Sequence, residues 1–194
     1  MNAIAEALGV QCEYCHQQAA PAEGPRRIDI ARQMIAMTRG LNETVQTATG
    51  KAAGTAVKVD CVTCHRGVAV PRPLGDVLWE TRQKDGIDAA VAQYRDLRTR
   101  YYGKQAYDFG EQTLLLLSQR VANAQPDDVA AFAKLNIEFN PQSSQSYQAL
   151  AFAYTRKLDD ESAITALEKA VEIDPNNAVA RGQLEQLKSY HRNR

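Results

Sequence analysis

Two pentapeptides hold all four cysteines of the chain and two of its three histidines: Cys12-Glu13-Tyr14-Cys15-His16 and Cys61-Val62-Thr63-Cys64-His65. Both read C-x-x-C-H, the attachment signature of c-type haem. Thiols one helical turn apart can add to the vinyl groups on one edge of the porphyrin, and the next histidine can then ligate the iron. The pattern predicts two covalently bound haems c. Their attachment residues are Cys12, Cys15, Cys61 and Cys64, and their proximal iron ligands are His16 and His65.

Three other cysteine chemistries compete with this interpretation. A zinc site made of two C-x-x-C pairs usually separates the pairs by about 15–20 residues, and Cys15 and Cys61 lie much further apart. A thioredoxin-like redox pair expects a strand–helix setting, which this sequence does not predict. Two structural disulfides would also use four cysteines. None of these alternatives accounts for the histidine that follows each pair, so we favour haem.

An internal repeat suggests the sixth ligands of the two irons. The first eight residues overlay on the eight that begin at Met34, with Met, Ala and Leu coinciding at the first, third and eighth positions. Each stretch precedes its own C-x-x-C-H, so the predicted unit is a helix, a connection and a haem-binding helix, used twice. Met1 and Met34 coincide and are predicted to be thioether ligands. Met37 coincides with Ile4 and is expected to pack in the core.

The same segments resemble the tetrahaem cytochrome c subunit of photosynthetic reaction centres and the wider family built on half of it. The similarity lies in Leu8-Gly9-Val10 before Cys12, in Ala31-Arg32-Gln33-Met34-Ile35-Ala36-Met37-Thr38, and in Cys61-Val62-Thr63-Cys64-His65-Arg66-Gly67. It covers roughly residues 1–73. In that family a methionine of each preceding helix ligates an iron, so the resemblance also implies Met34 and Met1. Two haem motifs are present here, where the photosynthetic subunit has four.

The rest of the chain predicts helices without strands. Pro71-Arg72-Pro73 closes the haem region, and apolar residues then recur at helical spacing from Val77 and from Ile87. Residues 147–175 resemble a tetratricopeptide repeat, with small residues at Ala151 and Ala170 and a terminating Pro175. We therefore expect an all-α protein with a dihaem cytochrome c domain over residues 1–73 and a tetratricopeptide-like helical domain over residues 74–194.

Composition limits the partners and the location. Acidic and basic residues are equal at 23 each, which gives no basic excess for nucleic-acid binding, and no apolar run is long enough for a transmembrane helix. Covalent haem attachment takes place outside the cytoplasm. We therefore expect a periplasmic or extracellular protein whose signal peptide has been removed, because the first residues show no signal-peptide pattern.

The predicted function is electron transfer to and from redox partner proteins, not enzymatic catalysis. One alternative is a subunit of a polymeric haem chain, in which the helical-repeat domain joins copies into a homo-oligomer or conductive filament. A second is a dihaem peroxidase, which would need an open iron, and the available methionines argue against it. His191 is expected to be a solvated terminal histidine, with an axial ligand given in trans to another subunit as the alternative.

Overall fold

The computed structural model describes residues 2–16, 24–123 and 125–192, with side chains up to residue 190. All regular secondary structure within these ranges is α-helical, which confirms the predicted all-α class. The chain folds into two compact units. Unit 1 contains Met1–Pro71 and Gly103–Ala106, and unit 2 contains Arg72–Tyr102 and Tyr107–Arg194.

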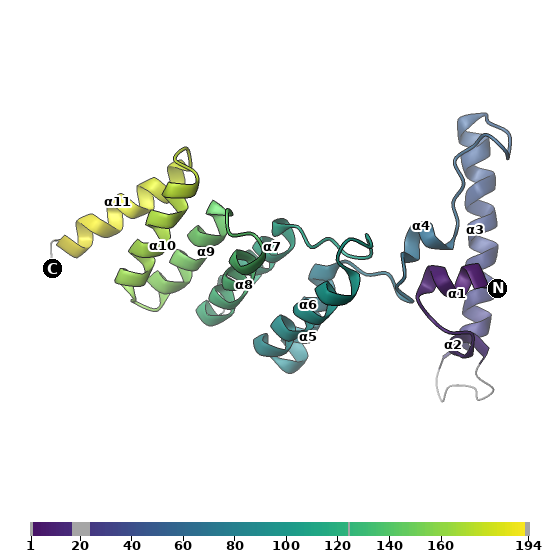
Figure 1. Ribbon diagram of the computed structural model, residues 1–194, viewed down its shortest axis with the longest axis horizontal. Helices are drawn as coiled ribbons and strands as arrows, with labels where there is room; N and C mark the ends of the chain where they lie inside the picture. The colour runs from purple at the N-terminus through teal and green to yellow at the C-terminus, as the bar shows by residue number, and fades with distance from the viewer. Residues whose placement is uncertain (1, 17–23, 124, 193–194) are drawn as a thin grey trace. The chain divides into compact units, whose positions relative to one another are not determined.

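Unit 1 has the repeated architecture that the overlay predicts. Its helices are α1 (Asn2–Leu8), α2 (Glu13–His16), α3 (Arg27–Thr49) and α4 (Cys61–His65) (Figure 1). Each C-x-x-C-H lies at a short helix that follows another helix, α2 after α1 and α4 after α3. The two halves also cross, because α1 packs against α4 and α2 packs against α3.

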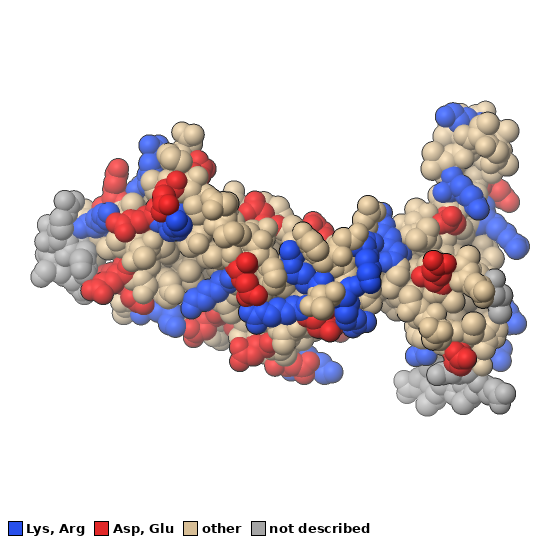
Figure 2. Space-filling model, in the orientation of Figure 1, with Lys and Arg blue, Asp and Glu red and all other residues tan. Residues whose placement is uncertain are grey.

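Unit 1 has almost no core made of its own side chains. Ala7 is its one buried hydrophobic residue among those described, and α3 buries no residue although it is 23 residues long. Much of the face of this unit seen in Figure 2 is covered by uncharged residues. Large apolar residues of α3 stay exposed at helical spacing, so they form one stripe: Ile30, Met34, Met37 and Leu41. The polypeptide therefore leaves an apolar surface uncovered.

Met37 corrects one of the expectations from the sequence. It was expected to pack in the core, but 49% of its surface is exposed. The prediction that the polypeptide buries Met37 is wrong, because the described residues leave about half of its surface exposed. Met34, on the same stripe, is 41% exposed.

Unit 2 is a series of helices that pack on their neighbours in sequence. The helices are α5 (Leu74–Asp85), α6 (Ile87–Tyr101), α7 (Glu111–Val121), α8 (Pro126–Phe139), α9 (Ser144–Arg156), α10 (Asp160–Ile173) and α11 (Ala178–Arg192). Contacts join α5 to α6, and each helix from α7 onward to the next (Figure 1). Pro73 immediately precedes α5, as the proline-rich segment predicts.

The pairing of α9 with α10 follows directly from the sequence. Both helices begin at a side-chain cap, where Ser143 accepts a hydrogen bond from the Ser146 amide and Asp159 accepts one from the Ser162 amide. Ala151 and Ala170 are both buried, so the predicted small residues do lie inside the packed helices. That these hairpins are tetratricopeptide repeats stays a prediction.

Unlike unit 1, unit 2 has a continuous hydrophobic core. Leu78, Tyr94 and Phe132 are fully buried in one cluster that extends from α5 to the start of α11. Arg82 forms an ion pair with Asp128 across α5 and α8, with 2.6 Å between its Nε and the carboxylate oxygen. Unit 2 therefore buries enough apolar surface to support its own helices.

A buried asparagine joins three helices of unit 2. Asn136 on α8 is completely buried, and its side-chain amide donates to the Glu111 carbonyl at 3.1 Å and to the Ser146 hydroxyl at 2.7 Å. Its amide oxygen accepts a hydrogen bond from Asn140 at 2.8 Å. These bonds fix the start of α7 and the first turn of α9 against α8.

Asn136→Ala should lower the free energy of unfolding of unit 2 by about 2–3 kcal/mol, because it leaves several buried polar groups without partners. Ser118→Ala is the matched control. Ser118 is also buried, but its hydroxyl donates only to the Leu114 carbonyl within its own helix, so its loss should cost less than about 1 kcal/mol. Urea unfolding followed by circular dichroism measures both. Equal losses of unfolding free energy in Asn136→Ala and Ser118→Ala would contradict the bridging role of Asn136.

Candidate cofactor site

A cavity of about 140 Å³ in unit 1 brings together the residues that the sequence assigns to the second haem. Cys61, His65 and Met34 all line it, although α3 and α4 are separated by a long connection. Most of the other lining residues are apolar: Ile4, Leu8, Ile30, Ala31, Ile35, Ala69 and Val70. Cys64 and Met37 are not among the lining residues. The cavity thus combines an imidazole, a thioether and two thiols, those of Cys61 and of Cys15 from the first motif, with an apolar wall.

A neighbouring cavity of about 90 Å³ contains the first motif. Cys12, Cys15 and His16 line it, together with residues of α1 and α3. The two cavities share part of their wall: Ile4, Leu8, Cys15, Ala31 and Ile35. Met1, the predicted sixth ligand of this site, lies outside the described residues, and the side chain of His191 is also not described.

The ring of His65 is held so that one nitrogen stays available. Its Nδ1 lies 3.0 Å from the carbonyl oxygen of Val68. As a donor to that carbonyl, Nδ1 carries the proton, and Nε2 keeps its lone pair for a metal. Gly67 has a φ of 85°, a conformation that suits glycine and turns the chain back toward the histidine. The turn at Arg66-Gly67 thus places the Val68 carbonyl against the His65 ring.

A close backbone contact joins the two halves of unit 1. The Gly67 amide donates to the Ala7 carbonyl at 2.8 Å. At Gly9, which has a φ of 66°, an added Cβ would overlap the carbonyl oxygen of Gly67. Only glycine both tolerates this φ and leaves room for the Gly67 carbonyl, which explains the glycine in the Leu8-Gly9-Val10 run before the first motif. The run is visible in the sequence, but its contact with the second motif joins residues far apart in the chain and leaves no local signal.

Asn42 on α3 is a second positioning residue that the sequence analysis missed. Its side-chain amide donates to the Val59 carbonyl at 2.7 Å, and its amide oxygen accepts from the Val59 amide at 2.9 Å. This pair of bonds fixes the chain just before α4 against α3. An asparagine inside a helix is the only signal in the sequence, since asparagine is disfavoured there.

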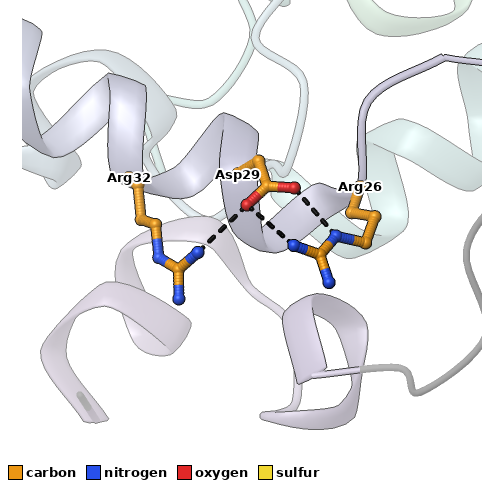
Figure 3. A network of polar contacts seen from close by, with 3 residues as sticks. All are labelled: Arg26, Asp29 and Arg32. Atoms are coloured by element: carbon orange, nitrogen blue, oxygen red, sulfur yellow. Dashed lines mark hydrogen bonds and ion pairs between the residues drawn. The ribbon is translucent and has the colours of Figure 1, made fainter.

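Charged residues gather at the start of α3. Figure 3 shows the guanidinium groups of Arg26 and Arg32 directed at Asp29, at 2.8 Å and 3.0 Å from its carboxylate oxygens. The hydrogen bond from Arg26 lowers the pKa of Asp29 below its ordinary value. Arg32 lines the His16 cavity and Arg27 lines the His65 cavity. Each cavity therefore has one arginine in its wall.

The competing cysteine chemistries find little support in the described residues. No disulfide joins any two of the four cysteines in the structure. Within the described ranges, no cluster of three or more His, Cys, Asp or Glu side chains could hold a metal ion, as a tetrahedral zinc site would need. The helices in this part of the chain also include none long and apolar enough to cross a membrane.

The sequence matches the model of the photosynthetic reaction centre cytochrome C subunit family over residues 9–131, which is more than half of the chain. The chain belongs to this family. It is therefore related to c-type cytochromes that function in electron transfer. A comparison with curated proteins finds no match.

The family match corrects the extent of the resemblance. It begins at Gly9 and continues past residue 73, where we placed its end, through α5, α6 and α7 into α8. The family region therefore includes both C-x-x-C-H motifs, Met34 and the first helices of unit 2. Its end within α8 does not coincide with the boundary between the two compact units.

Gly9→Ala should destabilise unit 1 by about 3 kcal/mol or more, because a β-carbon is strained at this φ and would displace the Gly67 backbone. Gly40→Ala is the matched control. Gly40 lies inside α3 with open space around it, so alanine there should stabilise the helix by about 0.5–1 kcal/mol. Thermal unfolding of the intact protein compares the two. A Gly9→Ala protein as stable as the wild type would exclude the close approach.

Proposed function

We propose that this chain is a dihaem c-type cytochrome that carries out electron transfer outside the cytoplasm. The observation that carries the proposal is the pair of adjoining cavities, one lined by Cys12, Cys15 and His16 and the other by Cys61, His65 and Met34. Membership of the cytochrome family supports haem as the group that they hold. When bound, haem supplies the one-electron chemistry, and the protein tunes it through ligands, burial and charge.

In the second site, Cys61 and Cys64 attach the haem, and His65 and Met34 are its iron ligands. The bond from His65 to the Val68 carbonyl supports this, because it leaves Nε2 free for the iron. Met34 is preferred over Met37 because it lines the cavity with His65, whereas Met37 does not. A thioether ligand favours reduced iron and so a relatively high potential.

In the first site, Cys12 and Cys15 attach the haem and His16 is the proximal ligand. Met1 as its sixth ligand rests on the overlay with Met34 and on the family resemblance. A methionine at both irons leaves no open position for peroxide, so the proposal is an electron carrier and not a peroxidase.

The fold of unit 1 gives independent support. A unit of this size has to bury apolar surface to be stable, yet its described residues bury only Ala7 among hydrophobic side chains. The exposed stripe of α3 and the apolar cavity walls provide the surface that a porphyrin would cover. Residues 1–73 are therefore proposed as the dihaem domain.

Residues 74–194 are proposed as a tetratricopeptide-like domain that binds a partner protein. A groove of about 700 Å³ along α9, α10 and α11 supports a binding role, and Phe152 and Leu158 are exposed residues in its wall. Assembly into homo-oligomers or filaments stays a prediction from the sequence. The periplasmic or extracellular location follows from the covalent haem.

The mass of the denatured protein tests the number of haems. We expect the polypeptide mass plus two haems, because thioether bonds survive acid and organic extraction whereas axial ligation does not. Variants with Cys12 and Cys15, or Cys61 and Cys64, changed to serine should each lose one haem. A denatured mass equal to that of the bare polypeptide would refute the proposal.

Met34→His should lower the potential of the His65 haem, because imidazole lacks the preference of the thioether for reduced iron. We expect a drop on the order of 0.1 V, a fraction of the range that axial ligands cover. Met37→Leu is the control and should leave both potentials nearly unchanged. A redox titration that resolves the two haems measures this. Loss of the methionine–iron band in Met37→Leu but not in Met34→Leu would reverse the assignment.

A further inference from the structure

Arg27 occupies an unusual place in the wall of the His65 cavity. It is the first residue of α3, and Ile30 and Met34 follow it on the same face of the helix. Among the residues that line this cavity, Arg27 alone has a permanently charged side chain. Because Arg27 is an exposed residue that also lines the cavity, it lies at the rim.

The described residues include an aromatic neighbour of Arg27 and no carboxylate partner for it. Its guanidinium carbon lies 4.2 Å from the centre of the Tyr14 ring, in a cation–π contact. No carboxylate in the described ranges pairs with it. The nearest acidic residue in the sequence, Asp29, pairs instead with Arg26 and Arg32 (Figure 3). Among the described residues, Arg27 thus presents a positive charge without a carboxylate partner at the edge of an apolar cavity.

The propionate carboxylates of haem are anions that could pair with Arg27. Its macrocycle is apolar and fits an apolar wall, whereas its propionate carboxylates seek water or a cation at the rim. A guanidinium binds a carboxylate through parallel N–H donors, with a geometry that lysine cannot reproduce. An arginine at the rim therefore matches the polar edge of a group whose apolar body would cover the cavity wall.

We propose that Arg27 binds a propionate of the haem ligated by His65 and Met34, and that Tyr14 is the positioning residue that holds its guanidinium there. This inference rests on the proposed dihaem function. It also gives Tyr14, a variable position of the first C-x-x-C-H motif, a role at the second haem.

The expected effect on the potential has a definite sign. Reduction adds one negative charge to the haem, so an uncompensated propionate nearby opposes it by Coulomb repulsion. Arg27 offsets the charge of that propionate and therefore favours the reduced state. Removal of its charge should lower the potential of the His65 haem and leave the His16 haem less affected.

Arg27→Gln and Arg26→Gln form a matched pair for the test, because they remove the same charge one residue apart. In the intact holoprotein, Arg27→Gln should lower the ratio of reduced to oxidised His65 haem at a fixed potential about tenfold, or ~59 mV for a one-electron couple. Arg26→Gln should change it by less than about twofold, because Arg26 is exposed and already paired with Asp29. Arg27→Lys should restore part of the shift.

Tyr14 provides a second arm that keeps the charge of Arg27. Tyr14→Phe preserves the aromatic face and should leave both potentials unchanged, whereas Tyr14→Leu should reproduce part of the Arg27→Gln shift. If the Arg27→Gln protein does not acquire its haems, the Tyr14 variants still test the proposal. Equal shifts in Arg27→Gln and Arg26→Gln, or no shift in Arg27→Gln and Tyr14→Leu, would overturn the proposal.

The mass of each denatured variant distinguishes a failure of the propionate contact from a failure of the proposed dihaem function. Two haems in every variant with no shift specific to Arg27 would overturn only the propionate contact. A wild type without two haems would overturn the proposed function, and this inference with it.

Discussion

The apolar walls of two adjoining cavities are the feature on which unit 1 depends. Its side chains converge around these spaces and not around one another, so that Ala7 is its only buried hydrophobic residue among those described. A cofactor that covers these walls would contribute the apolar contacts that a core normally supplies. Stable folding of this unit would then depend on its cofactors. Unit 2 differs because it buries large residues such as Tyr94 and Phe132 in a core of its own.

The two sites are interdependent because each half of unit 1 packs against a helix of the other half. The helix that belongs to the first motif, α1, packs against α4 of the second, and the bond from the Gly67 amide to the Ala7 carbonyl holds that contact. Ile4, Leu8, Cys15, Ala31 and Ile35 line both cavities. A displacement in this shared wall would reach both sites, since closely packed groups transmit small shifts.

A feature could be predicted from the sequence when it depended on residues close together in the chain, and not when it depended on residues far apart. The two motifs and helices such as α6 and α10 follow from local spacing, and the structure confirms the helices. Periodicity also places Met34 and Met37 on one stripe of α3, but it cannot say whether polypeptide or cofactor covers that stripe, so the prediction for Met37 was wrong. The contacts of Gly9 with Gly67 and of Asn42 with Val59 join residues far apart in sequence and leave little local signal. The family match beyond residue 73 was missed for a related reason, because α5 to α8 show only ordinary amphipathic patterns.

The two motifs also use their variable positions differently. Tyr14 places its ring against Arg27 of another helix, at a cavity that contains His65. Thr63, at the same position of the second motif, instead accepts a hydrogen bond from the Asp60 amide at 3.1 Å and so stabilises the start of its own helix. Under the proposed function, the fixed letters of C-x-x-C-H would give both sites the same attachment chemistry, while the variable letters give them different surroundings. Potential depends on those surroundings as well as on the ligands. Under the proposed function, two haems with the same pair of ligands could therefore differ in potential, and such a difference would give electron flow between them a preferred direction.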